Sequence, residues 1–241
     1  MKYVLTIAGF DPSNGAGLTA DIKTFETIGV YGLSVCTAVT VQHESKFNSL
    51  DWVKETTVLE QLSILLEKYP ITVVKVGLIE HLELLNQVIH RLRKAQPAIQ
   101  IIWDPILKAS AGFQFHNTID SELFTEVAKK CYLITPNKQE SAQLFGALTD
   151  TEIVNKYTNL LLKGGHENGD LSTDILFEKE AITKYSNPRL EYSKHGTGCV
   201  LSAAIAAYLV QGNSLKIACH KAKEYVTRFI QSTDTLLGKH S

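Results

Sequence analysis

The chain has 241 residues, of which 44% are hydrophobic and 20% are charged, and its formal net charge is −1 at pH 7. This length and apolar content can bury one large core, so we expect a single domain over residues 1–241. The balanced charge gives no electrostatic basis for binding nucleic acid or an anionic membrane. No apolar run approaches the ~20 residues of a membrane span, and the N-terminus resembles a strand more than a signal peptide, so we expect a cytoplasmic protein.

Short apolar runs alternate with helical patterns along the chain. The predicted strands are rich in β-branched residues and end at glycine, proline or polar residues; they are Tyr3–Ala8, Leu33–Val41, Val73–Val76, Ile99–Trp103, Tyr132–Thr135 and a run ending at Lys163. The predicted helices have apolar residues three and four apart; they are Leu18–Ile28, a segment around Leu59–Leu66, Leu82–Gln96, Asp120–Lys130 and Ser214–Ile230. Gly29 is expected to end the first helix as a left-handed cap, and Asp120 or Ser121 to cap the fourth.

Strands separated by helices indicate repeated right-handed βαβ units. We therefore expect a three-layer α/β/α fold with a mostly parallel central sheet and helices on both faces. Asp174–Phe177 and Ile182–Tyr185 flank a polar turn and predict a small antiparallel hairpin at the edge. Ligands bind such sheets at the carboxyl ends of the strands. Polar residues and glycines gather at these ends, in Asp11–Gly17, Gln42, Gly77, Asp104, Asn137–Glu140 and Lys163–His166.

A glycine-rich stretch, His195-Gly-Thr-Gly-Cys199, precedes a run of apolar residues at helical spacing. The spacing predicts an amphipathic helix whose free N–H groups and positive dipole end would attract an anion. Cys199 would lie beside that anion, where a positive environment lowers a thiol pKa from about 8.5. The alternative is that Gly196 and Gly198 only form a tight turn and Cys199 is a small buried residue.

Two carboxylates and an amide appear at neighbouring strand ends. Asp104 follows a strand, and Glu140 opens a helix after Asn137, a set that suits Mg²⁺ because this ion prefers oxygen ligands. Taken singly, Asp104 also fits a turn cap, and Glu140 fits an ordinary first-turn acid. Lys163 with the two following glycines would bind a nucleotide phosphate, or would be a surface lysine beside a flexible turn.

Asn14–Ala20 fits a Gly-x-Gly-x-x-Ala dinucleotide fingerprint, and Glu44 could serve as its ribose-binding acid. This pattern suggests an NAD(P)-dependent oxidoreductase. However, Gly15 lies seven residues after Ala8, whereas that fold places its first glycine in the turn directly after the strand.

His195 and Cys199 also fit a Cys/His hydrolase with the helix start as its oxyanion hole. That interpretation would not explain Asp104, Glu140 or Lys163. The chain has neither a P-loop nor the glycine-rich loop of protein kinases, so phosphate binding would depend on a different scaffold.

Taken together, six ordered motifs resemble those of the hydroxymethylpyrimidine/phosphomethylpyrimidine kinases of thiamine biosynthesis, a branch of the ribokinase-like superfamily. They span nearly the whole chain and are Leu5–Gly17 with Ala20–Phe25, Lys75–Gly77, Asp104-Pro105, Thr135–Glu140, Lys163–His166 and His195–Cys199. Each motif alone is a weak signal, whereas six in order are specific. The resemblance implies a homodimeric, Mg²⁺- and ATP-dependent kinase that phosphorylates 4-amino-5-hydroxymethyl-2-methylpyrimidine and then its monophosphate.

The resemblance also implies a role for each residue. Gly196, Thr197 and Gly198 would form the anion hole, and Cys199 would accept the proton of the attacking hydroxymethyl group. The residues implied to bind ATP are Lys163, Asn137 and Thr197, and those implied to hold Mg²⁺, directly or through water, are Asp104 and Glu140.

The implied pyrimidine pocket comprises Gly9, Ala16, Asp21, Gln42, Leu78 and Ile106. Asp21 and Gln42 can read the amino group and ring nitrogen of an aminopyrimidine through paired donors and acceptors. The simpler alternatives are that Asp21 is a first-turn helix acid and that Gln42 is an ordinary polar residue at a strand end.

Three features depart from the family pattern. The usual lysine after Asp-Pro is displaced in Lys108–Gly112, Phe10 replaces a small residue, and the segment Ala147–Asn159 is short enough to have lost a peripheral helix. Two alternative functions remain open: a pyridoxal kinase of the same fold, and a non-catalytic pyrimidine-binding regulatory protein.

Overall fold

The computed structural model describes residues 1–107, 120–165 and 169–241. Over these ranges, nine strands form one sheet in the order β3-β2-β1-β4-β5-β6-β7-β8-β9. The strands are β1 Tyr3–Phe10, β2 Tyr31–His43, β3 Lys46–Trp52, β4 Val73–Val76, β5 Gln100–Trp103, β6 Leu133–Ile134, β7 Asn159–Leu162, β8 Leu171–Glu178 and β9 Ala181–Pro188. The pairs from β2 through β7 are parallel, whereas β3 and the β8–β9 hairpin add antiparallel edges. The carboxyl ends of the parallel strands therefore meet at one edge of the sheet.

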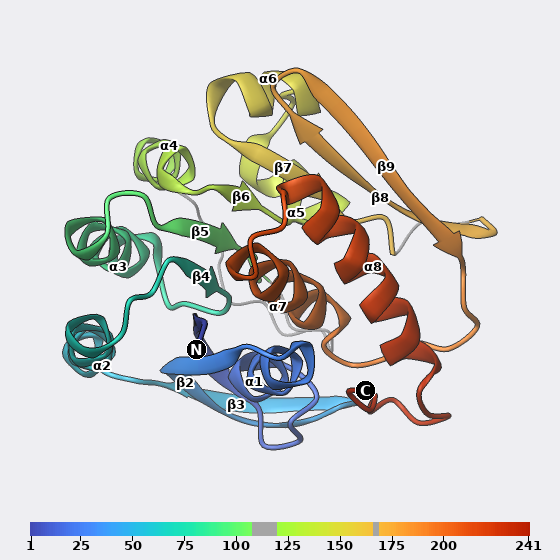
Figure 1. The fold of residues 1–241 in the computed structure, drawn as a ribbon, viewed down its shortest axis with the longest axis horizontal. Helices are drawn as coiled ribbons and strands as arrows, with labels where there is room; N and C mark the ends of the chain where they lie inside the picture. The colour runs from blue at the N-terminus through green and yellow to red at the C-terminus, as the bar shows by residue number, and fades with distance from the viewer. Residues whose placement is uncertain (108–119, 166–168) are drawn as a thin grey trace.

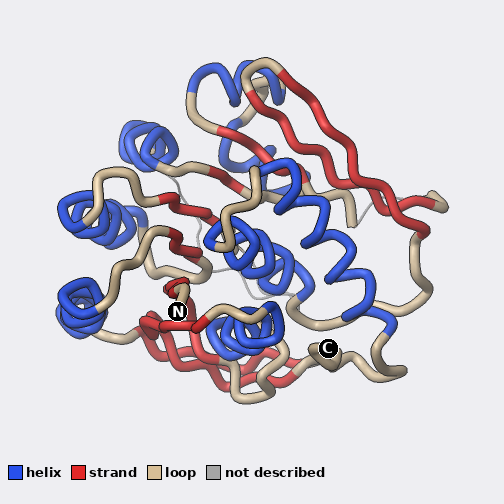
Figure 2. Tube along the Cα trace, viewed as in Figure 1, coloured by secondary structure: helices blue, strands red, loops and turns tan. Residues whose placement is uncertain are grey.

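Helices cover both faces of the sheet, so the predicted three-layer α/β/α fold is confirmed. Their bounds are α1 Gly17–Ile28, α2 Glu55–Lys68, α3 Leu82–Ala95, α4 Ser121–Lys130, α5 Lys138–Phe145, α6 Asp150–Lys156, α7 Thr197–Val210 and α8 Leu215–Gln231. α2, α3 and α4 lie along one face, and α1, α7 and α8 along the other (Figure 1). Figure 2 shows the strands running between these two groups of helices. In the part of the chain that the structure describes, none of the helices combines the length and the apolar character needed to cross a membrane.

The central strands are apolar on both faces because each face is covered. In β4 every residue is buried; Val74 and Val76 belong to the core beneath α2, α3 and α4, whereas Val73 belongs to the core beneath α7 and α8. This distribution follows from the strand geometry, because successive side chains point to opposite faces. Near-continuous hydrophobic runs are typical of such doubly covered parallel strands.

The helix that follows the glycine-rich turn is buried nearly all round, so the prediction of an amphipathic helix was wrong. Ten of the 14 residues of α7 are buried, on every side of the helix. The reason is that α7 packs against β1, β4 and β5 on one side and against α1 and α8 on the other. Small residues such as Ala203 and Ala207 permit this close packing between two layers.

Local signals predicted most element boundaries, but β2, β8 and β9 extend beyond the predicted residues. Gly29 ends α1 with a φ of 84°, and the Asp120 side chain accepts hydrogen bonds from the first turn of α4, as expected. β2 is longer than predicted and turns into β3, which the sequence analysis missed because its residues are mostly exposed and polar. The segment Ala147–Asn159 contains the seven-residue helix α6. The displaced lysine in Lys108–Gly112 lies outside the described residues.

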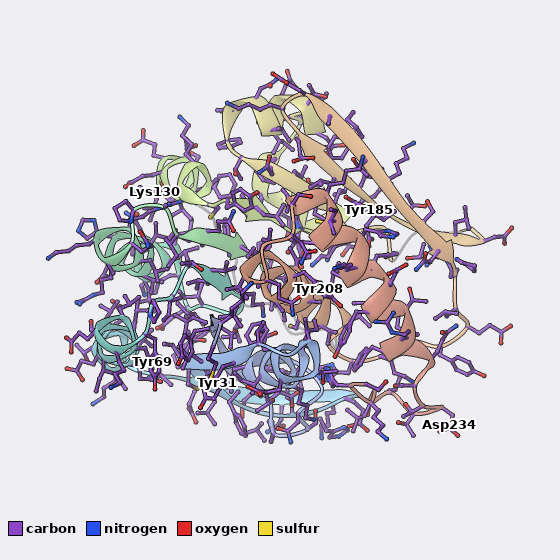
Figure 3. All side chains as sticks on the ribbon, viewed as in Figure 1. Tyr31, Tyr69, Lys130, Tyr185, Tyr208 and Asp234 are labelled. Atoms are coloured by element: carbon purple, nitrogen blue, oxygen red, sulfur yellow. The ribbon has the colours of Figure 1, made fainter. Side chains whose placement is uncertain are left out.

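The predicted β8–β9 hairpin is confirmed, and it is tied to α8. The Tyr185 hydroxyl on β9 donates a hydrogen bond to the Lys216 carbonyl of α8 at 3.0 Å (Tyr185 is labelled in Figure 3). The buried ammonium of Lys223 on α8 lies 2.9 Å from the Asp174 carboxylate on β8. These contacts hold the antiparallel edge against the last helix.

The burial of α7 predicts a large loss of stability on truncation within it. Ile205→Ala should lower the free energy of unfolding by about 2–5 kcal/mol, because it opens a cavity between two tightly packed layers. Ile217→Ala on α8 is the matched control and should change it by about 0.5 kcal/mol or less, since Ile217 is 47% exposed. Urea denaturation measures both, and equal losses would contradict the central position of α7.

Candidate active site

The glycine-rich turn lies where α7 begins, at the carboxyl edge of the sheet. Gly196 has a φ of 77°, and a Cβ atom there would lie 2.0 Å from the Gly15 carbonyl oxygen, so only glycine fits. As the N-cap residue, Gly196 has no side chain with which to cap this helix start. A Cβ atom on Gly198 would lie 3.4 Å from the Lys163 Nζ, which places that ammonium against the first turn. Free backbone N–H groups and a lysine therefore face the same space, as an anion site requires.

Three predicted residues from different strand ends meet beside this turn. The Lys163 Nζ lies 2.8 Å from the Asp104 Oδ1 and 3.8 Å from the Glu140 Oε2. Asp104 follows β5 and Lys163 follows β7, so neighbouring parallel strands bring them together as the sequence predicted. Burial opposes the charge on Lys163, but the two carboxylates outweigh it and raise the pKa of Lys163. The lysine therefore stays cationic. Its side chain is only 14% exposed and is paired with Asp104, which excludes the alternative of a free surface lysine.

Asp104 is anchored by two hydroxyl groups that the sequence analysis missed. Thr135 Oγ1 donates to Oδ1 at 3.1 Å, and Ser202 Oγ donates to Oδ2 at 3.0 Å. Burial alone would raise the pKa of Asp104, but Lys163, Lys75 and the Ser202 hydrogen bond together lower it. Ser202 lies one helical turn after Gly198, a spacing that could have identified it. The Asp104 carboxylate is therefore ionised and held by fixed donors.

Asn137 and Glu140 form a capping box at the start of α5. The Asn137 side chain accepts from the Glu140 N–H at 2.9 Å, and Glu140 Oε2 accepts from the Asn137 N–H at 2.7 Å. This pairing explains the spacing of the two residues without a ligand. Burial raises the pKa of Glu140, although the nearby charge of Lys163 lowers it in part.

A buried ion pair lies beneath the turn. The Lys75 Nζ is 2.7 Å from the Asp21 Oδ2, both side chains are fully buried, and Thr6 donates to the same oxygen at 2.5 Å. Burial raises the pKa of Asp21 although the lysine opposes this shift. Asp21 Oδ1 is buried without a hydrogen-bond partner among the described residues. Asp21 is therefore a buried counterion as it stands, rather than a group open to a ligand.

The Cys199 thiol lies in the first turn of α7 but does not have the lowered pKa that the sequence predicted. Cys199 is 7% exposed, and burial raises its pKa to about 11. Lys75 and a hydrogen bond from the Gly17 backbone lower it, but Asp21 and Asp104 add to the effect of burial. Proximity to a helix start was thus the wrong criterion, because desolvation dominates.

The predicted pyrimidine-binding residues fall into two groups. A Cβ atom on Gly9 would lie 3.0 Å from the Leu78 side chain, so these two residues adjoin. Ala16, the N-cap of α1, lies against Gly196 and so borders the glycine-rich turn. Gln42 lies half-buried on the β2–β3 hairpin. Ile106 lines a cavity of about 260 Å³ with Gly77 and Trp103, among other residues.

The parallel sheet, the uncapped helix start at its carboxyl edge and the adjoining lysine–carboxylate cluster fit a phosphotransferase, as the resemblance to ribokinase-like kinases implies. The family model described as phosphomethylpyrimidine kinase matches residues 11–241, so the chain belongs to this family. It is 36% identical to the thiamine biosynthesis bifunctional protein ThiED of Geobacter sulfurreducens, covering 98% of the chain but 51% of that protein. It is 34% identical to the hydroxymethylpyrimidine/phosphomethylpyrimidine kinase of Aquifex aeolicus, over 96% of the chain and 95% of that protein.

Solved structures show the same architecture. The phosphomethylpyrimidine kinase from Clostridium difficile 630 superposes with a TM-score of 0.80 at 30% identity, covering 95% of this chain and 99% of that one. The pyridoxal kinase from Staphylococcus aureus in complex with AMP-PCP superposes with a TM-score of 0.85 at 28% identity, covering 96% and 89%. Both types of kinase therefore share this fold.

The raised pKa of Cys199 predicts slow, strongly pH-dependent alkylation. Because only the thiolate reacts, the rate of iodoacetamide modification should keep rising as the pH approaches about 11 in the folded protein. In concentrated urea the same cysteine should titrate near about 8.5. Peptide mass mapping follows Cys199 separately, and a midpoint below about 8.5 in the folded protein would refute the burial argument.

Proposed function

We propose that this protein transfers the γ-phosphate of ATP to the hydroxymethyl group of 4-amino-5-hydroxymethyl-2-methylpyrimidine, and then phosphorylates the monophosphate. The observation that carries the proposal is the uncapped start of α7 facing Lys163, which itself pairs with Asp104. Phosphoryl transfer needs such positioning and electrostatic stabilisation more than covalent chemistry. The name of the Aquifex aeolicus relative, hydroxymethylpyrimidine/phosphomethylpyrimidine kinase, supports the same substrate.

In this proposal the amides of residues 196–199 hold the transferred phosphoryl group, and Lys163 balances its charge. Thr197, half-buried at the first position of α7, adds a hydroxyl donor beside them. Asn137 contributes to nucleotide binding through its amide N–H₂ group, because its oxygen is engaged in the helix cap.

The residues present fit a hydrated Mg²⁺ better than a directly ligated one. The Asp104 oxygens already accept from Lys163, Thr135 and Ser202, so the carboxylate would meet the ion through water. Glu140 lies beside this cluster, and Mg²⁺ commonly keeps several waters while binding carboxylates and phosphates. The ion would neutralise charge on the phosphates when bound.

Cys199 acts as the proton acceptor in this proposal, and it must first lose its own proton. About tenfold more thiolate forms with each pH unit while the pH stays below a pKa of about 11. Lys75 and the Gly17 N–H favour the thiolate, as the causes of the pKa shift indicate. In a loose transition state for phosphoryl transfer, the attacking hydroxyl does not need to lose its proton early. A small fraction of Cys199 thiolate is therefore sufficient in this proposal.

For the pyrimidine, the proposal places Gly9, Ala16 and Leu78 around the ring and Asp21 beneath it. The unpartnered Oδ1 of Asp21 suits the exocyclic amino group, which would supply the missing donor. Because Asp21 is fully buried, this contact requires a neighbouring group to move aside. Gln42 and Ile106 would complete the pocket.

Pyridoxal phosphorylation is the second candidate, because the pyridoxal kinase structure superposes with the higher TM-score of the two kinases compared. A similar hydroxymethyl group on a pyridine ring would occupy the same position. The 34% amino-acid identity to the Aquifex aeolicus protein named as a hydroxymethylpyrimidine/phosphomethylpyrimidine kinase favours the first candidate.

A comparison of the two alcohols tests the proposed function. With Mg-ATP, kcat/KM should be higher for the hydroxymethylpyrimidine than for pyridoxal, and mass spectrometry should detect the mono- and then the diphosphate. Removing Mg²⁺ with EDTA should stop turnover, and added Mg²⁺ should restore it. Higher kcat/KM for pyridoxal would overturn the substrate assignment, and no turnover of either alcohol would favour a binding protein.

The role of Cys199 predicts both a loss of rate and a loss of pH dependence. Cys199→Ala should lower kcat by about 100-fold or more while pyrimidine binding stays measurable by calorimetry. Wild-type kcat should rise between about pH 7 and 9 because the folded-state pKa is raised, and the variant should lack this rise. Unchanged turnover in the variant would remove Cys199 from the mechanism.

A further inference from the structure

The loop between β1 and α1 and the glycine-rich turn before α7 meet at a buried histidine–aspartate pair. The proposed reaction requires a fixed distance between these two segments. The Asp11 carboxylate, in the loop between β1 and α1, lies 2.9 Å from the Nε2 of His195, which precedes the glycine-rich turn. The side chains are 1% and 6% exposed. Neither residue has a role in the proposed reaction above, and a buried polar pair of this kind restricts the relative position of the segments that carry it.

Asp11 organises its own loop. Its Oδ1 accepts from the Ser13 N–H at 2.9 Å, and its Oδ2 accepts from the Ala16 N–H at 2.9 Å. The Ser13 hydroxyl donates to both oxygens. Burial raises the pKa of Asp11, but the hydrogen bonds of His195 and Ser13 lower it by more, so the carboxylate is ionised. Since Ala16 is the N-cap of α1, Asp11 fixes the backbone that the proposed pyrimidine would touch.

The two loops also touch through their backbones. The position of a Cβ atom on Gly196 is 2.0 Å from the Gly15 carbonyl oxygen and 2.9 Å from the Ala16 Cα. A Cβ atom on Gly15 would lie 2.7 Å from the His195 Cδ2. The two loops are therefore in close van der Waals contact, and the Asp11–His195 hydrogen bond links them across this contact.

The other side of His195 is held by the C-terminal segment. The His195 backbone N–H donates to the Leu236 carbonyl at 2.9 Å. The Lys194 Nζ donates to the Thr233 carbonyl at 2.7 Å and to the Thr235 carbonyl. Asp234, within this segment, is labelled in Figure 3, and the C-terminus lies beside α1 in Figure 1. His195 thus sits at a junction of three segments far apart in the sequence.

We propose that His195 is a positioning residue: through Asp11 it holds the phosphate-binding turn at a fixed distance from the loop that presents the acceptor alcohol. This inference rests on the proposed function for its catalytic consequence only. In-line transfer needs the attacking oxygen and the phosphorus correctly placed, and an error of about 1 Å can cost about 100-fold in rate. Loss of the pair should therefore act on the chemical step rather than on the binding of either substrate.

His195→Leu removes the donor while keeping an apolar side chain of similar volume, and His195→Gln keeps an N–H near the position of Nε2. His195→Leu should lower kcat about 10- to 100-fold with KM values for both substrates within about threefold. His195→Gln should keep kcat within about threefold of wild type. His220→Leu, on the exposed side of α8, is the matched control and should leave kcat unchanged.

A double-mutant cycle tests the pairing itself. Asp11→Asn combined with His195→Leu should be no slower than the slower single variant, because both remove the same interaction. Losses that multiply would overturn the proposal. A folded His195→Gln variant that is as slow as His195→Leu would also overturn it, because the imidazole rather than the hydrogen bond would then matter. A variant with raised KM values but unchanged kcat would do the same.

Hydrogen exchange provides a readout that does not depend on turnover. In ligand-free protein, His195→Leu should speed amide exchange in residues 14–17 and 196–199 at least about fivefold, with His195→Gln close to wild type. Unchanged exchange in His195→Leu would overturn the positioning role. If wild-type protein phosphorylates neither alcohol, the proposed function fails, while this exchange comparison still decides the role of His195. Circular dichroism confirms that each variant is folded.

Discussion

The structure depends on the burial of α7 between the sheet and the two helices α1 and α8. A helix enclosed on all sides cannot shift, so its first turn is fixed at the carboxyl edge of the parallel strands. Gly196 offers no side chain to cap that turn, and the N-cap of α1, Ala16, offers none either. α3, α4, α5, α6 and α8, by contrast, start with a capping side chain. The free N–H groups of α7 are therefore left for an anionic ligand.

Charges beneath this turn are balanced in pairs. Lys163 pairs with Asp104, and Lys75 pairs with Asp21, so two cations and two carboxylates lie around Cys199. Breaking such a buried pair leaves an uncompensated charge, which is costly even where the pair itself adds little stability. The arrangement keeps both lysines protonated. In the proposed function, the charge of the partly buried Lys163 would act strongly on a phosphate because little solvent screens it.

The sequence predicted the order of the elements and much of the site. Strand and helix periodicities located the parallel sheet, and strand-end position brought Asp104 and Lys163 together correctly. Capping rules correctly identified Asp120 and Gly29. The sequence did not predict β3, because this strand pairs with β2 through backbone groups and its exposed residues show little periodicity. The sequence did not predict the hydrogen bond from Ser202 to Asp104, because this bond depends on which side of α7 faces Asp104.

Local order along the chain thus determined the fold class, the glycine-rich turn and the residues available for phosphate chemistry, because propensity, capping and hydrophobic spacing act over a few residues. Only the tertiary structure decided the state of those residues. It buried Cys199 and raised its pKa to about 11, it turned Asp21 into a counterion for Lys75, and it paired His195 with Asp11. Desolvation and long-range charge pairing depend on which segments meet in space, and spacing along the chain does not contain that information.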